Sequence, residues 1–259
     1  MLLDDKVAIV SGIGPGMGRD ISLALAREGA DVVLAARSED RLREVADEVT
    51  ALGRRAVTVP TDITHAEQCQ NLVGTAVAEL GRVDVLVNNA FRQPPFQRLE
   101  EADAEDWRKG LKVNLFGTMQ LTALAVAPMK EQGSGSIVFI NSMSARRIEV
   151  DYGVYAAGKA ALLSAAKTLA LELGEFGIRA NSVVPGYIYG DSVKLLFQMR
   201  AAENGTTPEH EEELIRDETA LKHIPDSAEI ADSVVFYASD LSRVVTGTAL
   251  DVNGGHWMP

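Results

Sequence analysis

The chain contains a single cysteine, Cys69, among its 259 residues. No internal disulfide can therefore form, and the position of Cys69 in a helical pattern predicts a buried thiol rather than a nucleophile. The sequence also lacks an apolar run long enough to span a membrane, and its first residues lack the basic start of a signal peptide. These absences predict a cytoplasmic protein with no membrane partner.

Basic residues are in deficit. Lys and Arg number 25 against 37 Asp and Glu, which gives a formal net charge of −12. Such a charge opposes binding to nucleic acid or to anionic membranes. No repeat, low-complexity tract or linker interrupts the chain, and a hydrophobic content of 46% suffices for one large α/β core. We therefore expect one domain over residues 1–259 that acts on a small molecule.

Metal-ligand patterns are also missing. The acidic run 209–213, Glu-His-Glu-Glu-Glu, lies at a predicted helix start, where acidic residues interact well with the helix dipole and face water. His65, His223 and His256 show no ligand-like spacing with one another. No metal site is predicted.

A strand, a glycine-rich turn and a helix follow one another near the N-terminus. Val7–Ser11 has the apolar composition of a buried strand and continues directly into Gly12-Ile13-Gly14-Pro15-Gly16-Met17-Gly18. Apolar residues at helical spacing come next, and Gly29 supplies the expected stop. Small residues allow close backbone approach to a pyrophosphate, and the helix N-terminus offers free N–H groups. Taken alone, the pattern also fits a tight turn between core elements.

Apolar strands and amphipathic helices alternate along the rest of the chain. The helix between the second and third strands is predicted to begin after the N-cap Ser38 and to end at Gly53. Repeated βα units of this kind predict an α/β fold: a doubly wound, Rossmann-type parallel sheet of about seven strands with helices on both faces. Ligands of such sheets bind at the carboxyl ends of the strands. After the first, the strands are predicted at Asp31–Ala36, Ala56–Pro60, Val83–Asn88, Ser136–Asn141 and Arg179–Val184.

Tyr155 and Lys159 are four residues apart in a predicted helix, which places a phenol and an ammonium on one face. A nearby cation stabilises a phenolate, so this spacing predicts a lowered pKa for Tyr155 and a role in proton transfer. A Tyr-x-x-x-Lys spacing also arises by chance in many helices, and its significance depends on the motifs around it.

Together these motifs resemble the single-domain branch of the short-chain dehydrogenase/reductase family over essentially the whole chain. The glycine run from Ser11 to Gly18, Thr61-Asp62-Ile63-Thr64, Asn88-Asn89-Ala90 and Pro185-Gly186 match the family's cofactor motifs, with Phe91 where glycine is usual. The resemblance implies a nicotinamide dinucleotide as cofactor and a secondary alcohol or ketone as substrate. The cofactor-binding positions that it implies are Gly12, Gly16, Met17, Gly18, Asp62, Ile63, Asn89, Ala90, Tyr155, Lys159, Pro185, Gly186 and Ile188.

Asn114, Ser142, Tyr155 and Lys159 match the family's catalytic tetrad in order and spacing. By this resemblance Tyr155 exchanges the proton and Lys159 both lowers its pKa and bonds the nicotinamide ribose. Ser142 can donate a hydrogen bond to the oxygen where charge develops. The family uses the asparagine to hold a water that connects the lysine to solvent.

Cofactor choice depends on the end of the second strand. NAD-specific folds place Asp or Glu there to bind the ribose 2′-hydroxyl, whereas this chain has Ala36 followed by Arg37. The missing carboxylate and the guanidinium favour NADP, with NAD as the alternative. Arg37 could instead be a solvated loop residue, and Pro15 replaces the basic residue of many NADP-dependent relatives.

The segment 187–221 occupies the position of the family's substrate-binding loop and helices. Its apolar residues line a substrate pocket or form the packing face of a lid, and the first interpretation favours a hydrophobic or alicyclic carbonyl compound. They are Val193, Leu195, Leu196, Phe197 and Met199. Two other functions remain open: a cofactor-binding sensor without catalysis, and a nucleotide-sugar epimerase of the family's extended branch.

The predicted helix Tyr155–Phe176 is apolar around more of its circumference than one sheet contact requires. We therefore expect a homo-oligomer, a tetramer by family resemblance, in which the excess face packs against another subunit. The residues that broaden this face are Ala160, Ala161, Leu162, Leu163, Ala165, Ala166, Leu169, Ala170 and Leu171.

Overall fold

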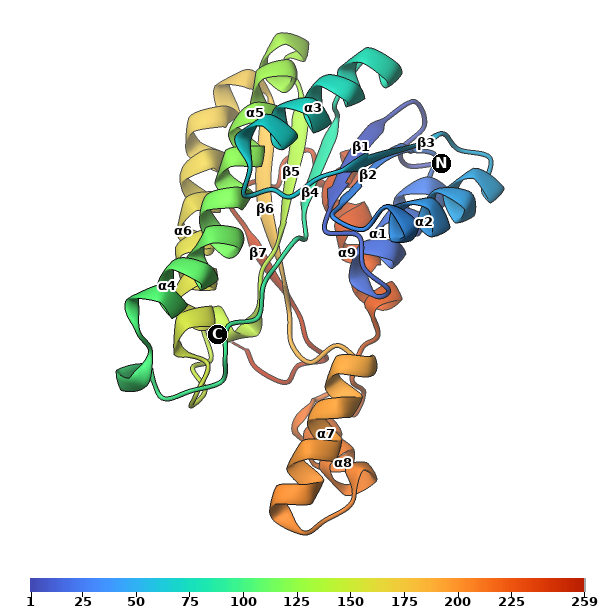
Figure 1. The fold of residues 1–259 in the computed structure, drawn as a ribbon. Helices are drawn as coiled ribbons and strands as arrows, with labels where there is room; N and C mark the ends of the chain where they lie inside the picture. The colour runs from blue at the N-terminus through green and yellow to red at the C-terminus, as the bar shows by residue number, and fades with distance from the viewer. Residues whose placement is uncertain (259) are drawn as a thin grey trace.

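Seven parallel strands form one twisted sheet in the computed structural model, which describes residues 1–258 (Figure 1). The strand order is β3-β2-β1-β4-β5-β6-β7, so the chain starts in the middle of the sheet and winds outward twice. This confirms the predicted fold class. The strands are β1 Val7–Ser11, β2 Asp31–Ala36, β3 Ala56–Pro60, β4 Val85–Asn88, β5 Gly135–Ile140, β6 Ile178–Pro185 and β7 Ala249–Val252.

Helices cover both faces of the sheet (Figure 1). The apolar residues of α1, α2 and α9 pack with Ala8 and Val10 on one face, and those of α3, α5 and α6 pack with Val7 and Ile9 on the other. Because successive strand residues enter opposite cores, the strands need to be apolar throughout. The helices are α1 Met17–Arg27, α2 Glu39–Ala51, α3 Ala66–Leu80, α4 Ala104–Leu111, α5 Thr118–Gln132, α6 Gly153–Leu173, α7 Asp191–Asn204, α8 Pro208–Glu218 and α9 Ser227–Ala238.

The first three strands match their predicted bounds, whereas the later ones differ by one or two residues. β4 begins at Val85 rather than Val83, because the side-chain amide of Gln132 takes both backbone bonds of Val83. β5 is shifted by one residue, and β6 is longer by one residue at each end. The α6 helix begins two residues before Tyr155 and passes into a 3₁₀ turn at Gly174.

Residue types at the two ends of α2 correctly predicted where this helix begins and ends. Ser38 caps α2 as predicted, since its hydroxyl accepts a hydrogen bond from the backbone N–H of Arg41. Gly53 adopts φ +78° just past the end of that helix.

Cys69 is fully buried in α3, and burial raises the pKa of its thiol, as expected of a structural cysteine. Within residues 1–258, no helix combines the length and apolar character needed to cross a membrane.

The α7 and α8 helices project beyond the carboxyl ends of the strands as a separate lobe (Figure 1). A small apolar cluster of Phe197, Ile215 and Ile224 holds this lobe together. The prediction that the acidic run of α8 faces water is wrong for Glu211, which is only 5% exposed. Hydrogen bonds from Asn204 and Thr206 satisfy this buried carboxylate and lower its pKa.

Candidate active site

The sequence-predicted site residues converge on the carboxyl edge of the sheet. They lie in the turn after β1, at the ends of β2 to β6 and on the first turns of α6, except for Asn114, which lies between α4 and α5. Parallel strands make this possible, because all of their carboxyl ends open on the same side.

Backbone packing fixes the glycine turn after β1. Gly12 adopts φ +88°, and a Cβ atom there would lie 2.5 Å from the backbone of Ala90. The Asn89 side chain donates a hydrogen bond of 2.7 Å to the Gly12 carbonyl. A Cβ on Gly18 would in turn meet that carbonyl oxygen at 2.3 Å. The ends of β1 and β4 can therefore approach this closely only with glycine at both positions.

The next two glycines are open. A Cβ on Gly14 would meet nothing within 4 Å, and one on Gly16 would meet only the Ser227 hydroxyl at 3.9 Å. Gly16 also provides no side-chain cap to α1, whereas α2, α4, α8 and α9 each have one. Open space beside uncapped N–H groups, with Met17 opening the helix, suits a dinucleotide pyrophosphate.

Arg37, Asp62 and Ile63 lie at the end of the site formed by β2 and β3. Arg37 is exposed directly after β2, and its charge reaches Asp62. Partial burial would raise the pKa of the Asp62 carboxyl, but hydrogen bonds from Thr64 outweigh it and lower that pKa. Asp62 is therefore an ionised acceptor. The Ile63 side chain is buried in the core at 5% exposure, so only its backbone can reach a ligand.

Asn114 lies in a π-helical stretch, Lys112–Gly117, between α4 and α5. Its buried side-chain amide makes two hydrogen bonds of 2.8 Å with the backbone of Arg92, one as acceptor and one as donor. Both partners are main-chain groups of the loop after β4. This clamp fixes the loop that begins with Phe91, whose side chain is 60% exposed.

Lys159 is the most constrained titratable side chain of the site. It is 3% exposed, and its ammonium donates a hydrogen bond of 2.7 Å to the carbonyl of Ile140 at the end of β5. Burial lowers the pKa of Lys159 to about 8. The ammonium lies 5.7 Å from the centre of the Tyr155 ring, so the helical spacing does bring the pair together.

The predicted lowering of the Tyr155 pKa is wrong for this structure. Burial raises the pKa of Tyr155 to about 12, and a hydrogen bond with Ser142 offsets only part of that rise. The Ser142 side chain also accepts the backbone N–H of Ser144, which orients it after β5. Desolvation is thus the largest influence on this phenol, and the hydrogen bond of the nearby ammonium goes to the Ile140 carbonyl.

The turn after β6 closes the site on its other side. Pro185 ends β6, and a Cβ on Gly186 would lie 2.9 Å from the Asn253 side chain, so this turn is also tightly packed. The Ile188 side chain packs against the core beneath α1 and α9.

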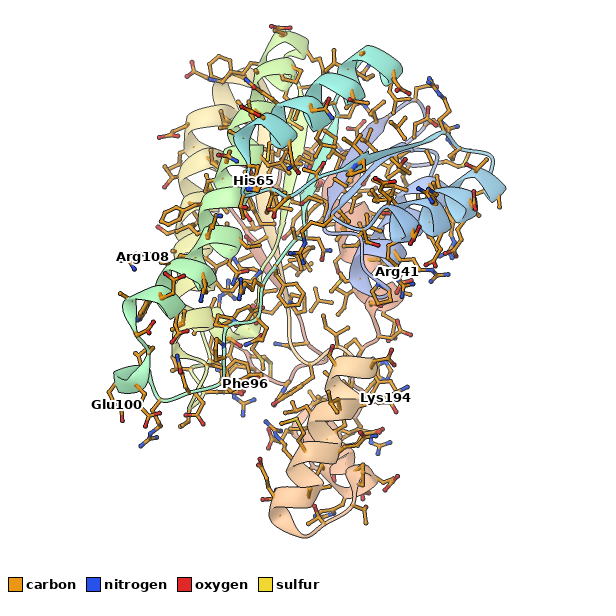
Figure 2. All side chains as sticks on the ribbon, in the orientation of Figure 1. Arg41, His65, Phe96, Glu100, Arg108 and Lys194 are labelled. Atoms are coloured by element: carbon orange, nitrogen blue, oxygen red, sulfur yellow. The ribbon has the colours of Figure 1, made fainter. Side chains whose placement is uncertain are left out.

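Several residues near Tyr155 carried little signal in the sequence. The Tyr152 ring meets that of Tyr155 edge-on at 6.4 Å. Phe96, labelled in Figure 2, packs on Tyr152 with ring centres 4.9 Å apart. The loop 89–98 had no periodic pattern that could place Phe96 there, and the carbonyl of Ile140 has no side-chain signature at all.

The buried ammonium predicts a specific pH dependence of stability. With a pKa of about 8 in the folded chain and 10.5 as its ordinary value, Lys159 binds fewer protons folded than unfolded between these pH values. The free energy of unfolding of the wild type, relative to Lys159→Met, should therefore rise with pH through that window. Denaturant titrations at fixed protein concentration measure it. Lys167→Met, an exposed lysine of the same helix, is the control, and a flat difference would contradict the assignment.

Comparison with known proteins agrees with this geometry. Residues 12–256 match the family model described as Enoyl-(Acyl carrier protein) reductase. The chain is 33% identical over 253 residues to 7alpha-hydroxysteroid dehydrogenase of Escherichia coli (strain K12), covering 98% of this chain and 94% of that protein. It is 36% identical over 261 residues to L-rhamnose 1-dehydrogenase (NAD(P)(+)) of Azotobacter vinelandii, covering 98% of each.

A solved structure of NAD+-bound xylitol dehydrogenase superposes with a TM-score of 0.92 at 26% identity, covering 98% of this chain and 100% of that one. Full-length similarity of this kind extends to fold, cofactor class and reaction class. The chain belongs to the short-chain dehydrogenase/reductase family and is an NAD(P)-dependent oxidoreductase that interconverts alcohols and ketones.

Proposed function

We propose that Tyr155 is the general acid and base of this reaction and that Ser142, Lys159 and Asn114 support it. The observation that carries the proposal is the placement of the Tyr155 phenol, partly exposed, between a serine hydroxyl and a buried ammonium at the carboxyl edge of the sheet. The bound nicotinamide supplies the hydride.

In the reducing direction, the Tyr155 hydroxyl donates its proton to the carbonyl oxygen of the substrate. A pKa near 12 keeps that proton on the phenol at neutral pH, so the residue is in the correct state to act as an acid. Ser142 donates a hydrogen bond to the same oxygen as negative charge develops there. In the oxidising direction Tyr155 accepts the proton of the alcohol, and the positive charge of Lys159 stabilises the phenolate.

The cofactor-binding residues are proposed on the same basis. The backbone of the turn from Gly12 to Gly18 and the first turn of α1 would hold the pyrophosphate, and Asp62 the adenine end. Asn89 and Ala90 support that turn through their contacts with Gly12. Pro185, Gly186 and Ile188 would border the nicotinamide, with Lys159 bonding its ribose.

The two alternative functions receive no support. A sensor that had lost catalysis would be expected to lack Tyr155 or Lys159, and both are present in one site. An epimerase of the extended branch usually carries a larger C-terminal substrate domain. The relatives named above are dehydrogenases, of which this chain covers 94% to 100%.

Replacing Tyr155 with Phe removes only the hydroxyl that transfers the proton. We expect kcat to fall by about 100-fold or more while the fold and cofactor binding are kept. Tyr152→Phe removes the neighbouring phenol and should keep about a third of the activity or more. Steady-state kinetics on folded protein measure both, and a Tyr155→Phe enzyme with more than about a tenth of wild-type activity would show that the proton comes from elsewhere.

We propose that the cofactor is preferably NADP, with NAD as the alternative. Arg37 is exposed after β2, beside Asp62, and Ala36 presents no carboxylate to repel a 2′-phosphate. A guanidinium in this position can pair with that phosphate. The NAD-bound state of the xylitol dehydrogenase shows the cofactor class of a relative and leaves this preference to experiment.

Arg37→Ala should weaken NADP binding by about tenfold or more and leave NAD binding nearly unchanged, because only NADP carries the 2′-phosphate. Fluorescence titration of both cofactors measures this. Arg41→Ala, which removes a nearby arginine that pairs with Glu44 on α2, is the matched control. Tighter binding of NAD than of NADP by the wild type would overturn the preference.

We propose that the segment 187–221 binds the substrate, which favours a hydrophobic or alicyclic carbonyl compound. Four of the predicted apolar residues fall into two groups that differ in exposure. Phe197 and Val193 pack inside it, whereas Leu195 and Met199 are 56% and 50% exposed. The first pair therefore holds the lobe together, and the second is free to contact a ligand.

A cytoplasmic location remains a prediction from the sequence.

We also propose a homotetramer built on the outer face of α6. That face exposes Ala157, Ala160 and Leu171, the last at 86%, next to Phe116 at 61%. Light scattering at micromolar concentration should therefore report about four times the chain mass of 27.8 kDa. Leu171→Glu should shift the population toward smaller species, and Leu52→Glu on α2 should not. A wild type that is entirely monomeric would rule the tetramer out.

A further inference from the structure

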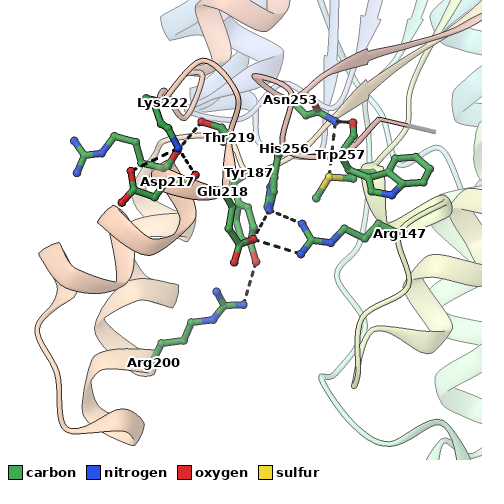
Figure 3. Close-up of polar contacts among 12 residues, drawn as sticks. Arg147, Tyr187, Arg200, Asp217, Glu218, Thr219, Lys222, Asn253, His256 and Trp257 are labelled. Carbon is green, nitrogen blue, oxygen red and sulfur yellow. Dashed lines mark hydrogen bonds and ion pairs between the residues drawn. The ribbon is translucent and has the colours of Figure 1, made fainter.

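Arg200 on α7 is a basic side chain without an acidic partner near the reacting tyrosine. Its guanidinium donates a hydrogen bond of 3.0 Å to the hydroxyl of Tyr187, a neutral phenol. Among residues 1–258, no carboxylate lies within 4 Å of it. The contrast is with Arg147, the other arginine labelled in Figure 3, which pairs with Glu218 at 3.4 Å and contacts His256.

The missing partner is notable because acidic residues are plentiful around Arg200. Two carboxylates act on it from a distance, Glu149 and Glu211. Glu211 is already bonded to Asn204 and Thr206 on its own lobe. In a chain with a net charge of −12, a partly buried guanidinium that bonds only a phenol has free donors for a ligand.

The charge of Arg200 acts on the ring that adjoins Tyr155. Tyr152 meets Tyr155 edge-on, and burial raises the pKa of Tyr152 while the charge of Arg200 opposes that rise. The guanidinium is therefore within electrostatic reach of the ring that adjoins the reacting phenol. Tyr187, which follows the Pro185-Gly186 turn, bonds the guanidinium directly.

Tyr187 is held firmly enough to orient Arg200. Its ring stacks on that of His256 with centres 5.5 Å apart and planes inclined by 25°, and it packs against Phe197 at 6.5 Å. His256 in turn contacts Arg147 and Glu218, so residues from four distant parts of the chain converge here (Figure 3). The guanidinium is thus held by Tyr187, one ring of a second aromatic group, while its charge acts on Tyr152 in the group that contains Tyr155.

We propose that Arg200 binds an anionic group of the substrate, so that the preferred substrate is a ketone or secondary alcohol with an apolar body and a carboxylate at its far end. The planar fork of the guanidinium matches a carboxylate in a bidentate pair. The rings of Tyr152, Phe96 and Tyr187 suit the apolar body between them. This inference rests on the proposed function in one respect, that Tyr155 marks the reacting end.

Matched ligands test the proposal without requiring turnover. The probes are methyl ketones that end in a carboxylate, from 4-oxopentanoate to 9-oxodecanoate, each paired with its neutral primary amide. Titration calorimetry of the full-length protein with oxidised cofactor present gives both dissociation constants while no ketone is reduced. We expect the acid to bind at least about tenfold more tightly than the amide at one or more chain lengths, the strength of a charge-assisted hydrogen bond.

Arg200→Met should abolish that preference, and Arg200→Lys, which keeps the charge without the fork, should keep part of it. Arg216→Met is the matched control, because it removes an arginine of the same lobe that pairs with Glu212. Equal binding of acid and amide by the wild type at every length, or an unchanged preference in Arg200→Met, would overturn the proposal.

Kinetics separate this failure from a failure of the proposed function. Turnover of the neutral amides with reduced cofactor tests catalysis by Tyr155 and does not depend on Arg200. If the amides react and the acids have no advantage in kcat/KM, only the anion subsite is wrong. If the acids bind preferentially but Tyr155→Phe turns them over normally, the subsite stands and the role of Tyr155 falls.

Discussion

The burial of one ammonium group constrains the whole site. Lys159 is almost inaccessible to solvent, and its hydrogen-bond acceptor is a neutral backbone carbonyl, that of Ile140. A buried charge without a counter-ion costs several kcal/mol, which the two apolar cores of the sheet must offset. The bond joins α6 to the end of β5, so the helix that carries Tyr155 is fixed in position by the lysine four residues later.

That constraint extends to the neighbouring elements. Gly158, next to Lys159, lies where α6 packs on the end of α4 and on the π-helical stretch: a Cβ there would be in van der Waals contact with Leu111 at 3.4 Å and with Asn114 at 3.8 Å. Asn114 in turn holds the backbone of Arg92 in the loop after β4. The residues that follow β5 and β4 are thereby held, directly by Lys159 and through Asn114, beside the same helix.

Burial also inverts the ordinary order of proton affinities. The usual pKa of lysine, 10.5, lies just above that of tyrosine, 10.0, whereas here the pKa of Tyr155 is about 12 and that of Lys159 about 8. At neutral pH the Tyr155 phenol therefore keeps its proton, which is the state required in the reducing direction. Environments that separate two pKa values in this way are how one site assigns distinct roles to two groups. The arrangement favours Tyr155 as the acid and Lys159 as the nearby cation that stabilises the phenolate.

The sequence predicted the parts of this structure that depend on side-chain pattern. Strands β1 to β3, the cap at Ser38 and the helical pairing of Tyr155 with Lys159 follow from local periodicity and residue type. The net pKa of Tyr155, the burial of Glu211 and the start of β4 did not follow. The start of β4 depends on the contact of Gln132 with Val83, which is distant in sequence, and the other two depend on burial, which has no local signature.

The role proposed for Arg200 could not be predicted from the sequence either. Nothing in the sequence of α7 distinguishes it from a solvated arginine, because its lack of an acidic partner is a property of the folded lobe. The lobe has its own small core and joins the sheet through short connections, including the bridge between Tyr189 and Asp226. Residues of the lobe can therefore change without disturbing the ammonium, the phenol or the glycine turn. If the lobe binds the substrate as proposed, the donors that it leaves free set specificity, whereas the groups around the reacting bond stay at the edge of the sheet.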